Sequence, residues 1–140
     1  MKRMLPYLVT LSLGLWLGGL AALILFVSTL FVKARGVAGE AATVLFHTFE
    51  KYQLVLAAVA LLSLVVWRWT GRSRTKTLTL AAVLMATLLA VVQIALITPR
   101  IERYRDVDRP AFDRYHRLAS ANYTTTGAFV LAAFVLATTA

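Results

Sequence analysis

The sequence of 140 residues contains no cysteine, which excludes disulfide bonds, thiolate metal ligands and cysteine nucleophiles. It also lacks the HExxH, GxSxG, phosphate-loop and dinucleotide-loop patterns that carry much enzyme chemistry. Serine, histidine and aspartate occur, but no spacing among them singles out a catalytic triad. We therefore predict that the protein is not an enzyme.

Acidic residues are scarce: six Asp and Glu stand against 15 Lys and Arg, for a formal net charge of +9. Such a balance is found in nucleic-acid-binding proteins. Here, however, the basic residues lie at the ends of apolar blocks, where membrane proteins anchor their helices. We predict that the partner is a lipid bilayer and that the protein binds no nucleic acid.

Apolar residues are abundant, at 60% of the chain, with a mean hydropathy of +0.76. They form four long blocks, which predict an all-α integral membrane protein, an up-and-down bundle of four transmembrane helices in one domain over residues 1–140. The first block exceeds the roughly 7–15 residues of a signal-peptide core, so we expect an uncleaved span. The expected spans cover residues 5–32, 42–69, 77–98 and 119–140.

Breaks between the spans are predicted from glycine, proline and charge. The segment 33–39 is rich in glycine and should interrupt the helix. Pro99 should end the third span, because the residue before a proline disfavours helical backbone. Residues 100–116 are predicted to form a charged amphipathic connector on the membrane surface, with Asp108 capping a helix that has Pro110 in its first turn.

Small residues recur at four-residue spacing in two spans. In lipid, such stripes let helix backbones approach closely, within a bundle or between protomers. We therefore predict helix packing through these positions and a homo-oligomer or a larger membrane complex. The packing positions are Gly14, Gly18, Ala22, Ala82, Ala86 and Ala90.

Four spans place both termini on one side of the membrane, together with the loop between the second and third spans. That side carries six basic residues and no acid, which favours a cytoplasmic location. Counting Lys and Arg alone favours the other side, which has nine, but many of those can pair with a nearby carboxylate. We therefore predict that both termini are cytoplasmic. In a bacterium the membrane would be the plasma (inner) membrane. The six basic residues are Lys2, Arg3, Arg68, Arg72, Arg74 and Lys76.

The second span begins with polar residues. Its purely apolar part, Leu54–Trp67, has 14 residues, whereas a span needs about 20. The helix must therefore carry polar groups from His47, Glu50, Lys51 or Gln53 below one membrane surface. Ionisable groups at such depth are costly and tend to mark functional sites.

A candidate polar site combines these groups with others on the third and fourth spans. The second and fourth spans can lie diagonally across a bundle, so that two histidines could converge. Two imidazoles with a carboxylate suit a divalent metal, and two imidazoles alone suit a haem. Alternatively, the polar groups are interhelical hydrogen bonds that only stabilise packing. The candidate residues are His47, Glu50, Gln53, Gln93, His116 and Asn122, with His47 and His116 as the metal candidates.

Aligning His47 with His116 also matches Gln53 with Asn122 and produces two similar halves. Each half is a span, a charged connector and a second span, as in transporters with parallel repeats. Two interpretations stay open: two parallel helical-hairpin repeats, or a chance alignment of two helical hairpins.

Four segments carry a resemblance to a known family. They read LGLWLGGLAALILFVSTLF, VLFHTFEKYQLVLAAVALL, ITPRIERYRD and AFDRYHRLASANY. Over nearly its whole length the chain resembles the small four-helix membrane proteins grouped with transmembrane protein 205 and the domain-of-unknown-function 4149 proteins. The resemblance implies a four-helix membrane fold and no established reaction.

Three functional interpretations follow. The favoured one is a structural or partner subunit, or an oligomeric scaffold, because four short helices rarely enclose a complete pathway. The second is an ion or small-solute transporter, or a channel-like protein, that uses the polar site. The third is a membrane protein that binds a metal or haem through the two histidines.

Overall fold

The computed structural model describes residues 4–71 and 73–139, and every secondary-structure element in these ranges is helical. Lys2, Arg3 and Arg72, which add to the predicted basic end, lie outside the described residues. The segments α3, η1 and α4 follow one another without a break as one rod, Arg74–Tyr104. The elements are α1 (Met4–Lys33), α2 (Arg35–Trp69), α3 (Arg74–Val92), the π-helix η1 (Gln93–Ile97), α4 (Thr98–Tyr104) and α5 (Arg109–Thr138).

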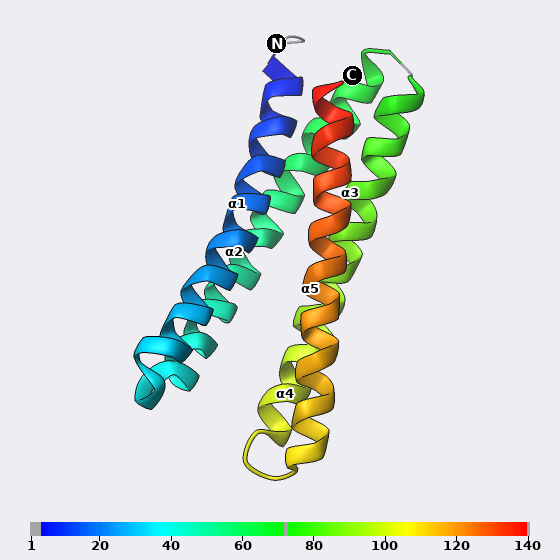
Figure 1. Cartoon of the computed structure of the whole chain (residues 1–140). Helices are drawn as coiled ribbons and strands as arrows, with labels where there is room; N and C mark the ends of the chain where they lie inside the picture. The colour runs from blue at the N-terminus through cyan, green and yellow to red at the C-terminus, as the bar shows by residue number, and fades with distance from the viewer. Residues whose placement is uncertain (1–3, 72, 140) are drawn as a thin grey trace.

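In the described residues, four helical rods are long and apolar enough to cross a membrane, which confirms the predicted fold class. α1 packs along α2, and α3 packs along α5, so the chain forms two hairpins. The hairpins contact each other through α1 with α5 and through α2 with α3. Figure 1 shows α1 beginning and α5 ending at the same end, which we call the terminal end.

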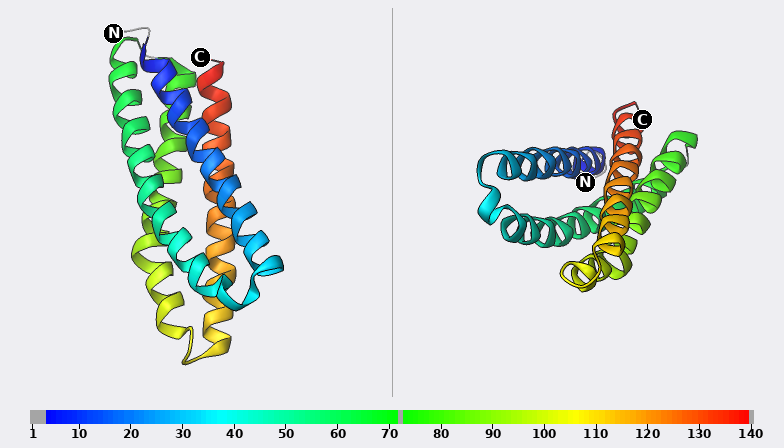
Figure 2. Two further views of the ribbon diagram at one scale, coloured as in Figure 1. Left: turned by 90° about the vertical axis from the view of Figure 1, so that its left-hand side faces the viewer. Right: turned by 60° about the horizontal axis from the view of Figure 1, so that its bottom comes forward.

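The two hairpins lie close together at the terminal end and diverge toward the opposite end, which we call the tip end (Figure 1). The tip end holds the α1–α2 connection and the loop between α4 and α5 (Figure 2). This divergence means that contacts between the hairpins at the tip end depend on particular side chains.

An apolar core joins the helices near the terminal end. Trp16 and Leu13 of α1 are fully buried, as are Val83 of α3 and Val130 of α5. Large apolar side chains such as Leu62 point outward, at 70% exposure. Such faces suit lipid acyl chains, so the helices associate through close packing and polar contacts instead of through exclusion of water.

The predicted break over residues 33–39 is much shorter in the structure. Only Ala34 is non-helical, with φ −140° and ψ 49°, and α2 begins at Arg35. Gly36 and Gly39 lie inside the helix, where nothing crowds them. An immediate return to helix pairs the backbone groups again, which a low-dielectric environment favours.

Pro99 does not end the third rod, contrary to the prediction. The π-helix η1 precedes it, and Thr98 N donates to Gln93 O, five residues back. A proline ring crowds the carbonyl four residues earlier, and the wider π turn provides room for it. The rod therefore continues to Tyr104.

The predicted surface connector 100–116 is divided between two rods. Its first part belongs to α4 and its last part to α5, and residues 105–108 form the link. The predicted cap is confirmed: Asp108 Oδ1 accepts a hydrogen bond from Ala111 N at 3.0 Å, and Pro110 lies in the first turn of α5.

The small residues pack differently from the spacing pattern. A Cβ added to Gly14 would lie 3.4 Å from Phe134, whereas one added to Gly18 would meet nothing within 4 Å. The close approach is at Gly19, where a Cβ would lie 2.8 Å from Tyr52 and 3.0 Å from Phe49. Ala86 and Ala90 are buried, and Ala22 and Ala82 are half-buried.

We expect Gly19→Leu to destabilise the monomer by about 1–3 kcal/mol, because the new side chain overpacks the contact between α1 and α2. Gly18→Leu is the matched control and should leave monomer unfolding unchanged, since its position is open. The measurement is thermal or denaturant unfolding of the monomer in mild detergent. Equal destabilisation by both changes would contradict this packing.

Candidate functional site

A chain of polar side chains crosses the junction between the hairpins toward the tip end. It starts in the core on α5, passes through η1 and α4, and reaches α2 and then the outside. Several members are buried in a layer that is otherwise apolar, so each needs a hydrogen-bond partner. The members are Asn122, Gln93, Thr98, Glu50, His47 and Glu102.

The inner part of the chain is buried. Asn122 Nδ2 donates to Leu89 O at 3.0 Å and to Gln93 Oε1 at 3.1 Å. Gln93 Nε2 donates to Thr98 Oγ1 at 3.2 Å, and Thr98 donates in turn to Glu50 Oε1. These bonds join α5, the third rod and α2.

The π turn brings Gln93 and Thr98 together. In an α-helix, residues five apart point to different sides, because each residue turns the chain by about 100°. In a π-helix, bonds run between residues five apart, which places them near one another. The turn that accommodates Pro99 therefore also aligns Gln93 with Thr98.

The outer part of the chain is an imidazole between two carboxylates. His47 Nδ1 lies 3.5 Å from Glu50 Oε2, and His47 Nε2 lies 2.6 Å from Glu102 Oε1. Glu50 is on the same hairpin as His47, whereas Glu102 belongs to the other hairpin. Nearby, Arg105 Nη2 donates to Thr43 Oγ1 at 2.6 Å. Polar contacts thus connect α2 to α4 and to the loop that follows it.

Glu50 is the most unusual member of the chain. It is 4% exposed and lies in a helix that is apolar enough to cross a membrane. Within the described ranges, the basic side chain that pairs with it is His47, and no Lys or Arg does so. A buried carboxylate without a permanent cation is costly in lipid, so its oxygens need the partners that Thr98 and His47 provide.

Two buried polar atoms lie beside this chain without a partner in the described structure, Gln53 Nε2 and the Tyr123 hydroxyl. Gln53 Oε1 accepts a bond from Trp16 Nε1 at 3.4 Å, on the core side of Glu50. The Tyr123 ring packs on Phe46 and Phe49, with ring centroids 5.6 and 6.2 Å apart. The surroundings of Glu50 therefore offer further polar groups.

The structure places the predicted site residues unequally. His47, Glu50, Gln93 and Asn122 share one hydrogen-bonded chain, and Gln53 lies one turn further along α2. Of the two residues aligned by the predicted repeat, Gln53 and Asn122, each is buried in the second helix of its hairpin.

His116 takes no part in the chain, so the expected convergence of His47 and His116 is wrong. Its exposed ring stacks on Phe112, with centroids 5.8 Å apart. The inward positions of α5 are Ala119 and Asn122, and Tyr115 continues that face by stacking on Tyr104. His116, one residue further on, therefore points outward.

The metal and haem interpretations are not supported by this geometry. Nowhere in the described residues do three or more His, Asp or Glu side chains form a group suited to a metal ion. Glu50 and Glu102 approach opposite nitrogens of the His47 ring, so they do not face one shared point. With His116 turned outward, the histidines do not form a pair of axial ligands.

Sequence reasoning missed Thr98 and Glu102. The predicted third span ended at Thr98, before Pro99, and Glu102 fell in the predicted connector. Their spacing of four residues places them on one helical face, which was the available signal. A spacing of four residues indicates a shared face only if the helix continues through Pro99.

The fold and this buried polar chain define a multi-pass α-helical membrane protein. The chain belongs to the family described as Domain of unknown function (DUF4149), whose model matches residues 11–110. The matched segment includes every member of the polar chain except Asn122. No match was found among curated proteins or among solved structures.

We expect Thr98→Val to destabilise the protein by about 1–3 kcal/mol, because it leaves Glu50 Oε1 and Gln93 Nε2 without their Thr98 partner. Thr87→Val is the matched control on the same rod, since the Thr87 hydroxyl bonds only to Val83 O of its own helix. Unfolding in mild detergent measures both variants. A cost for Thr98→Val no larger than that of the control would contradict the network.

Proposed function

We propose that the protein is a proton-responsive membrane protein in which the state of His47 sets how closely the two hairpins associate. The observation that supports this is the His47 ring between Glu50 and Glu102. One carboxylate is buried in the span, and the other is 45% exposed on the opposite hairpin.

The chemistry of imidazole provides the response. Histidine is the side chain that ordinarily changes its charge near neutral pH. When it is protonated, both ring nitrogens donate, so His47 can bind both carboxylates at once. When it is neutral, one nitrogen carries a lone pair, which would face a carboxylate oxygen and repel it. Loss of the proton should therefore weaken the link between α2 and α4.

Proton exchange is possible along the same groups. Glu102 faces outward and can pass a proton to His47 Nε2, and His47 Nδ1 can pass one to Glu50. The groups that face Glu50 are His47 of α2, Thr98 of α4 and, from α5, the phenol of Tyr123. Beyond Thr98 the chain continues through the amides of Gln93 and Asn122, which stay neutral.

The transport interpretation receives less support from the other half of the bundle. The buried hydroxyls of Ser12 and Thr79 donate to carbonyls of their own helices, at 2.8 and 2.9 Å. We therefore favour a switch that exchanges protons at the tip end over a complete path through one chain. The proposal assigns the protein no enzymatic reaction.

The scaffold interpretation is compatible with this switch. We propose that copies of the chain, or other membrane subunits, contact the outward side of α1 at Gly18, where a helix could approach without a clash. The terminal end carries Arg68, Arg74 and Lys76, so we place it in the cytoplasm and, in a bacterium, the protein in the plasma membrane. The link to transmembrane protein 205 stays a resemblance.

The switch is tested with spin labels at Val44 and Val107, which are exposed on the two hairpins near the tip end. The chain has no cysteine of its own, so the spin label reacts only with the two introduced cysteines. In lipid nanodiscs, we expect the distance between the labels to be longer at alkaline pH than at acidic pH. The measurement is pulsed electron paramagnetic resonance at several pH values.

The controls use the two histidines of the chain. His47→Gln should abolish the pH dependence of the distance, because glutamine bonds without changing charge. His116→Gln should preserve it, since His116 lies outside the polar chain. A distance that does not change with pH in the native chain, or a change that survives His47→Gln, would refute the switch.

Association through α1 is tested separately. We expect Gly18→Leu to raise the dissociation constant of the oligomer at least about tenfold, equivalent to about 1.4 kcal/mol, while monomer unfolding is unchanged. Native mass spectrometry from mild detergent gives the populations. Undiminished oligomers in this variant, or a native chain that is wholly monomeric, would count against the contact.

A further inference from the structure

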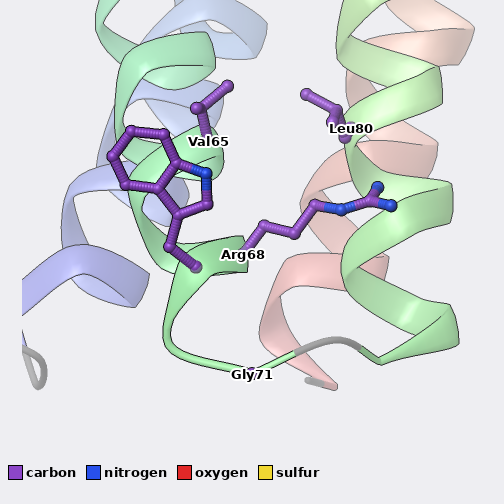
Figure 3. Close-up of a pocket in the computed structure, with 5 residues that line it drawn as sticks. Val65, Arg68, Gly71 and Leu80 are labelled. Atoms are coloured by element: carbon purple, nitrogen blue, oxygen red, sulfur yellow. The ribbon is translucent and has the colours of Figure 1, made fainter.

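A cleft lies at the terminal end, away from the polar chain and between the end of α2 and the start of α3 (Figure 3). Its volume is about 630 Å³. Two walls are apolar, Val65 from α2 and Leu80 from α3, and the mouth is formed by Arg68, Trp69 and Gly71. The cleft thus has an apolar interior toward the middle of the span and a polar, charged mouth at its end.

Arg68 provides the charge at the mouth. Figure 3 shows its side chain extending from α2 across the gap toward α3. The six acidic residues of the sequence, at positions 40 to 113, all lie toward the tip end, so none is available here. Among the described residues, no carboxylate pairs with Arg68.

The neighbouring cation is already engaged. Lys76 Nζ lies 4.8 Å from the centre of the Trp67 ring and donates to Gly71 O at 3.2 Å and Trp67 O at 3.4 Å. Lys76 therefore stabilises the turn beside the cleft. It contributes positive electrostatic potential there, but its side chain does not occupy the cleft. Arg68 is left with its donors directed into the gap.

Trp69 fixes the depth of the cleft in the membrane. It is 80% exposed at the last residue of α2, where an aromatic ring prefers the headgroup level. Val65 is one turn deeper on α2, and Leu80 lies in the second turn of α3, so both are at acyl-chain depth. The order from mouth to interior is thus cation, interface aromatic and aliphatic side chains.

We infer that this cleft binds an anionic phospholipid. The Arg68 guanidinium contacts the phosphate, and one acyl chain lies against Val65 and Leu80. Arginine is suited to phosphate because its planar fork donates two parallel hydrogen bonds. Basic pockets between transmembrane helices recognise anionic headgroups by the same combination of charge and depth. This inference does not depend on the proposed proton switch.

Trp69 serves as the reporter in the test, because lipids with brominated acyl chains quench tryptophan on contact. The native protein is reconstituted in vesicles of phosphatidylcholine that contain a rising fraction of either brominated phosphatidylglycerol or brominated phosphatidylcholine. We expect brominated phosphatidylglycerol to reach half-maximal quenching at a lipid fraction about fivefold lower than brominated phosphatidylcholine does. This factor is the attraction expected of one basic residue for an anionic lipid. Trp69→Phe should remove most of the signal, since Trp16 and Trp67 are buried.

Arg68→Gln should abolish the headgroup preference. Arg74→Gln is the matched control: it removes the same charge from the same end, but Arg74 does not line the cleft, so the preference should persist. A separate arm adds inorganic phosphate at constant ionic strength and should leave quenching unchanged.

Three outcomes would overturn the inference. The first is equal quenching of the native protein by the two lipids. The second is an equal loss of preference in Arg68→Gln and Arg74→Gln, which would indicate surface potential alone. The third is loss of preference with inorganic phosphate, which would indicate a site for free anions. The comparison of the two brominated lipids uses the native protein, so it can refute the inference even if a variant fails to fold.

Discussion

Glu50 places a carboxylate inside an apolar layer, and the surrounding structure depends on how its oxygens are satisfied. One oxygen accepts a bond from Thr98, and the other faces the imidazole of His47. Thr98 can donate there because the π turn before Pro99 keeps the third rod helical at this depth. A single buried charge therefore connects the path of the third rod, the position of α4 and the contact between the hairpins.

The two ends of the molecule are held together by different interactions. Near the terminal end, the helices share an apolar core around Trp16. Toward the tip end the hairpins diverge, and they are connected by the hydrogen bond that Glu50 accepts, by the one that Arg105 donates and by the His47–Glu102 contact. Packing thus joins the helices at one end, while hydrogen bonds and an imidazole between two carboxylates join the hairpins at the other end.

Sequence patterns correctly predicted the features that depend only on residues close to one another in the chain. The apolar blocks predicted the helical rods, and Asp108 with Pro110 predicted the start of α5. The patterns failed where a neighbour decides the outcome. Pro99 predicted a helix end, but the π turn absorbs the proline. The glycine spacing did not single out Gly19, where the rings of Phe49 and Tyr52 pack against α1. His116 matched His47 in alignment but faces outward.

The sequence by itself determined that the chain forms apolar helices and that the second of them carries polar groups below the membrane surface. Length, hydropathy and the short run Leu54–Trp67 suffice for this, because burial in lipid is a property of each helix alone. Only the tertiary structure decided which polar groups meet. Glu50 meets Thr98, and His47 meets Glu102 instead of His116. These pairings depend on how far each rod is rotated about its axis and how far it extends. Those quantities arise from packing between helices, and no single segment encodes them.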